Sequence, residues 1–85
     1  MHFALGNDFA RQRRWSEAQQ AYFNAFSLDP DNPDYAYNLA VSLDQLNQPR
    51  AALSYYERAR QLSEARSAQF NRAQLEQRVN ELKQP

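Results

Sequence analysis

The chain contains the same residue pattern twice, and this repetition constrains its fold more than any other feature. Residues of the same type recur 34 positions apart in the two halves, for example Leu5 and Leu39, or Tyr22 and Tyr56. The remaining matches are Gly6 with Ala40, Phe9 with Leu43, Ala18 with Ala52, Ala25 with Ala59, and Leu28 with Leu62. A fixed offset of roughly 20–50 residues is typical of architectures that stack copies of one supersecondary unit. The sequence therefore predicts two copies of one unit within a single small domain of 85 residues.

The composition of both copies favours helices over strands. Alanine, leucine, glutamine, glutamate and arginine are abundant, and these residues favour helices. No stretch alternates apolar and polar residues as a half-buried strand would. Breaks at proline and asparagine divide the chain into helical segments. We predict an all-α fold of five helices, at about residues 3–12, 16–28, 33–46, 49–62 or 49–63, and 67–83.

The segment LDPDNPDYAYNL joins the two copies. The preceding helix is expected to end at Asp29, because the residue before a proline disfavours helical dihedrals. Asn32 then lies where a helix N-cap is expected, and Pro33 occupies the first helical position, where proline is common. Without glycine, this joint is expected to hold the two copies at a rigid angle.

The repeated residues resemble the pattern of the tetratricopeptide repeat family over about residues 1–66. The first copy supplies Leu5, Gly6, Phe9, Ala18, Tyr22, Ala25 and Pro30, and the second supplies Ala36, Leu39, Ala40, Leu43, Ala52, Tyr56 and Ala59. The copies depart from the family pattern at His2, where a large apolar residue is usual, at Arg13, where glycine is common, and at Glu64, which replaces the closing proline. The resemblance implies antiparallel helix-turn-helix units, at residues 1–32 and 33–66, that stack into a right-handed superhelix.

The C-terminal part, residues 67–85, lacks the repeated pattern. Its apolar residues form one stripe on a helix with a polar outer face, a pattern typical of a surface helix. These apolar residues are Phe70, Ala73, Leu75, Val79 and Leu82. Arrays of stacked units commonly end in a unit with a polar outer face. We therefore predict a C-terminal capping helix, which completes a single domain over residues 1–85.

Charge and composition argue against several partners. Ten basic and ten acidic residues leave no net charge, whereas nucleic-acid-binding domains usually carry an excess of positive charge. The short basic turn with Arg11, Arg13 and Arg14 is the alternative, as a site for nucleic acid or lipid headgroups. No stretch approaches the ~18 consecutive apolar residues of a membrane-spanning helix. We predict no nucleic-acid partner and no direct insertion into a membrane.

The sequence indicates neither an enzyme nor a cofactor. It contains no cysteine and a single histidine, His2, so the usual pairs of nucleophile and base cannot be assembled from these residue types. Asp29, Asp31 and Asp34 could instead bind calcium, but prolines occupy the bend where calcium loops commonly have a glycine. We predict no catalytic residue, no metal site and no cofactor.

The family resemblance implies a binding groove along the first helix of each unit, where relatives take an extended peptide or a partner helix. The groove would be lined by Phe3, Asn7, Tyr37, Asn38, Val41, Gln45 and Arg72. Some relatives hold a C-terminal carboxylate there with two asparagines, an arginine and two lysines. Asn7, Asn38 and Arg72 fall on three of these positions, but Phe3 and Ala68 replace the lysines, which removes most of the charge for a carboxylate. The sequence favours the alternative of a more apolar groove around Phe3, Tyr37 and Val41, with Phe3 and Tyr37 as aromatic anchors.

Two functions remain open on the sequence alone. The first is a non-catalytic module that binds a protein or peptide partner as an adaptor or scaffold. The second is a structural or self-associating segment, which implies a homo-oligomer. The run PDYAYNLAVSLDQL is similar to tetratricopeptide segments of bacterial pilus-assembly and secretion-associated envelope proteins. That resemblance implies a soluble bacterial domain of the cytoplasm or periplasm, within a membrane-anchored protein in the latter case.

Overall fold

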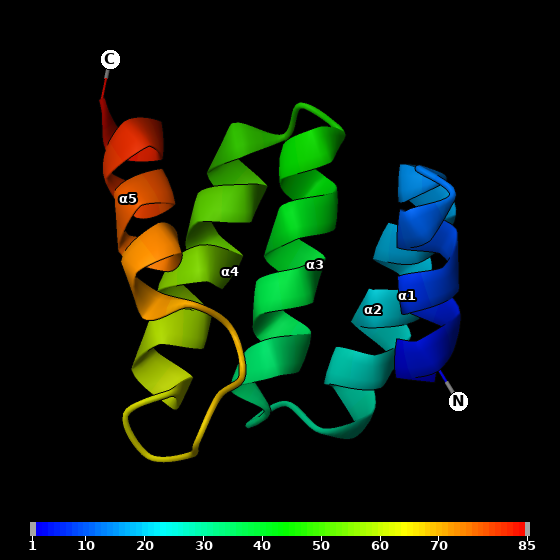
Figure 1. Ribbon diagram of the computed structural model, residues 1–85, viewed down its shortest axis with the longest axis horizontal. Helices are drawn as coiled ribbons and strands as arrows, with labels where there is room; N and C mark the ends of the chain where they lie inside the picture. The colour runs from blue at the N-terminus through cyan, green and yellow to red at the C-terminus, as the bar shows by residue number, and fades with distance from the viewer. Residues whose placement is uncertain (1, 85) are drawn as a thin grey trace.

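The computed structural model describes residues 2–84, which form five α-helices and no strand. The helices are α1 (His2–Arg11), α2 (Trp15–Leu28), α3 (Pro33–Gln45), α4 (Pro49–Leu62) and α5 (Arg72–Lys83). Figure 1 shows successive helices running in opposite directions across the molecule, from α1 and α2 at one end to α5 at the other. The all-α prediction is confirmed, and the first four helices begin and end within one residue of their predicted bounds. The predicted limits at Met1 and Pro85, and the side chain of His2, lie outside the described part.

The turns α1–α2 and α3–α4 have the same backbone geometry. Arg13 and Asn47, which are 34 positions apart, both have a φ of 59°. Glycine adopts this left-handed conformation without steric cost, so both positions would suit a glycine. In both turns the next amide donates to a carbonyl of the preceding helix, Arg14 to Phe9 at 2.9 Å and Gln48 to Leu43 at 3.0 Å.

The joint between α2 and α3 has the predicted cap. The side-chain oxygen of Asn32 accepts hydrogen bonds from the amides of Asp34, at 3.0 Å, and Tyr35, at 3.2 Å. Pro33 is the first residue of α3. These bonds satisfy two of the amides that a helix start leaves without a partner in the helix, so the N-cap prediction is confirmed.

The predicted start of the fifth helix at residue 67 is wrong, because α5 begins at Arg72. Residues 64–71, which we call the connecting segment, form turns and a stretch without regular secondary structure instead. Asp34 of α3 accepts hydrogen bonds from the amides of Gln69 and Phe70, and this tertiary contact holds the backbone out of a helix. The side chain of Asn71 then caps α5 by accepting from the amide of Gln74 at 3.1 Å. Phe70 therefore precedes the helix on which its apolar stripe was predicted.

The core is built from small and aromatic residues. The backbone of α1 approaches α2 so closely that a Cβ atom added to Gly6 would lie 2.6 Å from the ring of Tyr22. At the position of this glycine only a residue without a side chain avoids that overlap. Leu75 and Val79 of α5 are fully buried, whereas Ala73 is exposed. The other buried apolar side chains are Ala18, Ala21, Tyr22, Ala25, Ala36, Leu39, Ala40, Leu43, Ala52, Tyr56 and Ala59.

A polar cluster joins the end of α3 to α4 and α5. Arg78 of α5 donates two hydrogen bonds of 2.6 Å to the carboxylate of Asp44 in α3. The hydroxyl of Tyr56 in α4 donates to the same carboxylate at 3.0 Å. The hydrogen bonds from Arg78 hold the pKa of Asp44 below its ordinary value of 3.8, although partial burial opposes them. Burial and the adjacent carboxylate raise the pKa of Tyr56, which stays protonated.

Candidate functional site

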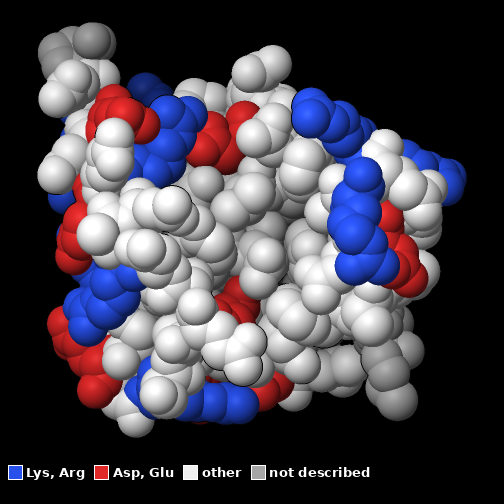
Figure 2. Space-filling view, in the orientation of Figure 1, with Lys and Arg blue, Asp and Glu red and all other residues white. Residues whose placement is uncertain are grey.

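A shallow hollow of about 220 Å³ lies between α1, α3 and the connecting segment. It is lined by Phe3, Asp34, Tyr37, Asn38, Gln69 and Phe70. Figure 2 shows the face that is in front in Figure 1, where uncharged side chains cover much of the middle and charged side chains lie mainly toward the edge. We call the hollow between α1, α3 and the connecting segment the groove.

Aromatic rings lie on both sides of the hollow. Phe3 of α1 stacks on Tyr35 of α3, with 4.7 Å between ring centroids. Tyr37, two residues after Tyr35 in α3, stacks on Phe70 with a centroid distance of 4.7 Å and an interplanar angle of 14°. Tyr37 also meets Tyr56 of the core edge-on at 5.7 Å. Partial burial raises the pKa of Tyr37 above its ordinary value of 10.0, so this ring is neutral and offers an apolar face with a hydroxyl donor.

The charged group of the groove is acidic. The carboxylate of Asp34 accepts from the amide of Gln69 at 2.9 and 3.1 Å and from the amide of Phe70 at 3.1 Å. The backbone carbonyl of Asp34 accepts from the side-chain amide of Asn38 at 2.8 Å. Hydrogen bonds that involve an ionised acceptor are stronger than neutral ones. The carboxylate thus holds two backbone amides of the connecting segment, and these are the kind of donor that a peptide chain presents.

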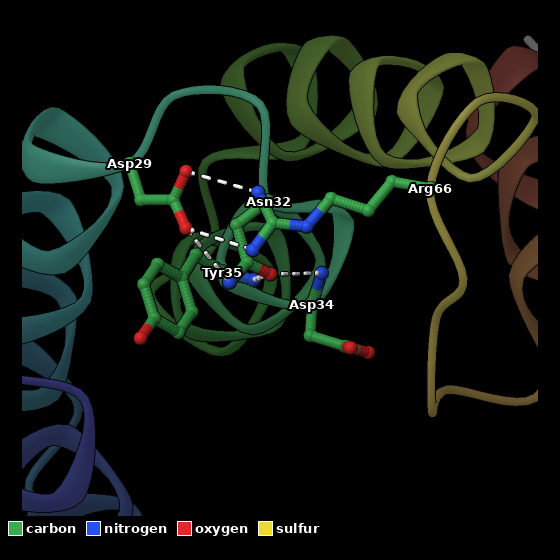
Figure 3. A network of polar contacts seen from close by, with 5 residues as sticks. All are labelled: Asp29, Asn32, Asp34, Tyr35 and Arg66. Atoms are coloured by element: carbon green, nitrogen blue, oxygen red, sulfur yellow. Dashed lines mark hydrogen bonds and ion pairs between the residues drawn. The ribbon is translucent and has the colours of Figure 1, made fainter.

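An ion pair joins the start of the connecting segment to the end of α2. Arg66 forms two hydrogen bonds of 3.0 Å with the carboxylate of Asp29 at the end of α2. Figure 3 shows this pair next to Asn32, whose side-chain amide also donates to Asp29. The bond from Arg66 is the main cause that holds the pKa of Asp29 below its ordinary value of 3.8. Asp29 and Asp34 belong to the acidic segment that was considered as a calcium loop. In the structure their carboxylates accept hydrogen bonds from the protein itself.

The structure brings together three of the seven residues predicted to line the groove, namely Phe3, Tyr37 and Asn38. Val41 packs against the buried core. Gln45 and Arg72 are exposed and lie outside the groove lining.

Asn7 has a structural contact within the first helix pair. Its side-chain oxygen accepts from the hydroxyl of Tyr22 at 2.7 Å and so links α1 to α2. Asn38 also uses its amide within its own helix. Both asparagines that fall on carboxylate-clamp positions are therefore engaged inside the protein. With Asp34 as the ionised group of the groove, the site suits amide donors better than a ligand carboxylate.

Two lining residues, Gln69 and Phe70, were not predicted from the sequence. Phe70 was placed on a helix, and the role of Asp34 as acceptor for a segment 35 residues further along was not foreseen. The sequence does contain one signal. Asn71 directly precedes a run of good helix formers, and an asparagine in that place is typical of an N-cap. It would have placed the start of α5 at Arg72 and left Gln69 and Phe70 outside the helix.

No protein-family model matches the chain, and a search of curated proteins found no match. The resemblance to the tetratricopeptide family therefore stays a prediction that rests on the residues of this chain.

Proposed function

We propose that the chain is a non-catalytic protein-binding module that takes an extended peptide in the groove between α1 and α3. The observation that carries this proposal is the aromatic groove, in which the half-exposed rings of Phe3 and Tyr37 flank the carboxylate of Asp34. Aromatic side chains are the usual anchors of peptide recognition. A carboxylate acceptor beside them matches the backbone amides that every extended peptide presents.

The proposed architecture is two tetratricopeptide-type units followed by the capping helix α5, stacked as a right-handed superhelix. It is supported by the equal φ angles of Arg13 and Asn47 and by the matching hydrogen bonds of the two turns. It is also supported by Leu75 and Val79, which bury one face of α5 at the end of the molecule. In such a stack the first helices of the units lie on one face, where Phe3 and Tyr37 meet the groove.

Peptides selected from a random phage-displayed library on the wild-type protein test this proposal. We expect Tyr37→Ala to weaken their binding roughly tenfold or more, because truncation of an aromatic anchor typically costs this much or more. Phe3→Ala is expected to act in the same direction. Phe23→Ala is the matched control, since Phe23 is an exposed phenylalanine of α2 outside the groove lining. Affinities are measured by isothermal titration calorimetry, with circular dichroism to confirm that each variant keeps its helices.

Equal affinities for the wild type and a helical Tyr37→Ala variant would contradict the groove assignment. Loss of binding in Phe23→Ala as well would show that the peptides recognise another surface.

The second candidate function is self-association, as a structural segment of a larger assembly such as a bacterial envelope complex. It is favoured by a hollow on the outer side of α1 and α2, lined in part by Leu5 and Phe9, and by Leu5 itself, which is partly exposed. Sedimentation equilibrium discriminates the two functions. A mass that rises with concentration toward that of a dimer favours self-association, whereas a constant monomer mass favours the peptide-binding module.

A further inference from the structure

The connecting segment lies against the groove in the way that a bound peptide would. Residues 67–70 are outside any helix, and two successive amides, those of Gln69 and Phe70, donate to the carboxylate of Asp34. The ring of Phe70 lies flat on Tyr37. One acceptor for the backbone and one ring for a side chain are the two elements by which an extended peptide is recognised.

Apart from the ring of Phe70, which stacks on Tyr37 and packs against the edge of the core, the segment is held by few contacts. Within residues 2–84, the hydrogen bonds from residues 67–70 to the helices are those to Asp34. The flanking pair of Arg66 and Asp29 is largely exposed, with side-chain exposures of 49% and 38%, so solvent screens it. Segments with few buried contacts and exposed hydrogen bonds open at low cost in free energy. The segment can therefore leave the groove while the helices stay folded.

We propose that residues 67–70 are an internal ligand of the groove, and that the external ligand is an extended peptide with an aromatic residue that replaces Phe70 on Tyr37. This inference rests on the proposed function. The aromatic residue of the ligand stacks on Tyr37, while its own amide and the preceding amide donate to Asp34. Acidic residues next to the aromatic position are disfavoured by repulsion from Asp34. Ligand binding and release of the segment are coupled, because the apparent affinity scales with the fraction of molecules in which the groove is open.

The test uses the segment itself as the probe, as a synthetic peptide of residues 64–71 with acetylated and amidated ends. It is titrated into the ¹⁵N-labelled wild type and into Phe70→Ala, and binding is followed through the amide shifts of Tyr37 and Asn38. We expect Phe70→Ala to bind the peptide roughly three- to tenfold more tightly than the wild type does, since this range corresponds to the usual strength of an aromatic pair. Phe23→Ala is the control protein, and the same peptide with alanine in place of its phenylalanine is the control probe.

Equal or weaker binding by Phe70→Ala would overturn the inference, because it would make Phe70 part of the wall of the groove rather than its occupant. Absence of binding to both proteins would overturn it as well. A second readout does not depend on the peptide, since Asp34→Asn should speed hydrogen exchange at the amides of Gln69 and Phe70 while core amides stay protected. Unchanged exchange at these two amides would also count against the internal ligand.

Failure of this inference is distinguishable from failure of the proposed function. If library-selected peptides bind wild type and Phe70→Ala equally and still require Tyr37, the groove binds peptides and the internal ligand is excluded. If their binding does not require Tyr37, the proposed function itself fails.

Discussion

Leu39→Ala is expected to lower the free energy of unfolding by about 2–5 kcal/mol, whereas Leu5→Ala, at the matching position 34 residues earlier, lowers it by less than about 1 kcal/mol. The reason is burial. Leu39 has an exposed fraction of 0% and Leu5 has one of 46%. Removing Leu39 leaves a cavity inside the core, while removing Leu5 takes away a side chain that is already half in water.

Urea unfolding followed by circular dichroism measures both changes, and thermal unfolding gives a second measure. For a domain of this size the loss at Leu39 corresponds to a fall in Tm of about 10 °C or more. Leu5→Ala is the matched control, since both variants lose the same atoms from a leucine in a helix. Similar losses in the two variants would show that the outer side of α1 is covered in solution, which would favour self-association over the monomeric module.

The two leucines show what an internal repeat can and cannot predict. The 34-residue offset predicts that both belong to equivalent helices of one pattern. Burial depends on neighbours, however, and α3 packs against both α2 and α4, whereas α1 packs mainly on α2. A residue at an end of the molecule can therefore match the repeated pattern and still be exposed, because fewer helices surround it. Leu28 also differs in burial from its counterpart, since 76% of its surface is exposed whereas Leu62 is partly buried.

Helix limits were predictable wherever the signal was local. Proline and asparagine around Asn32 and Pro49 placed the ends of the middle helices within one residue, because caps and fixed φ angles act over a few positions. The start of α5 was placed too early: the local N-cap signal of Asn71 was overlooked, and the contact of Asp34 with the amides of Gln69 and Phe70 joins residues far apart in sequence. Tertiary contacts of this kind routinely override helix propensity.

Part of the groove was predicted through the family resemblance. Tyr37 and Asn38 in α3, and Phe3 in α1, were predicted to face one surface, and all three line the hollow. The other residues next to the hollow, Gln69 and Phe70, belong to the connecting segment, whose path depends on a loop conformation rather than on a period. Gln45 and Arg72 were assigned from the same family pattern and lie outside the groove lining. For Arg72 the pattern could not indicate that α5 begins at this residue rather than at residue 67.

Helix α3 holds the C-terminal part of the chain at both of its ends. Asp34, in its first turn, binds the connecting segment, and Asp44, in its last turn, binds Arg78 of α5. The first contact is exposed and made to backbone amides, whereas the second is partly buried and made to a guanidinium and a tyrosine hydroxyl. We therefore expect the connecting segment to open before α5 leaves α4.

Asp44→Asn is expected to lower the free energy of unfolding by about 1–2 kcal/mol at pH 7, because it removes an ionised acceptor from bonds to Arg78 and Tyr56. The exposed fraction of the Asp44 side chain is 14%, so water replaces the lost bonds poorly. Asp8→Asn is the matched control, since Asp8 pairs with Arg11 on the surface of α1. Exposed pairs of this kind contribute little to stability.

The same substitution has a defined pH dependence. The carboxyl of Asp44 has its ordinary pKa of 3.8 in the unfolded chain and a lower pKa in the folded protein. Between these two values the unfolded chain binds more protons, so the stabilisation from Asp44 is complete above pH 3.8 and is lost as the pH falls through the folded pKa. The stability difference between wild type and Asp44→Asn should therefore shrink toward acid pH, as urea unfolding at a series of pH values from 7 to 2 can measure. A difference that stays constant over this series would mean that the Asp44 carboxylate contributes no charge-dependent stability.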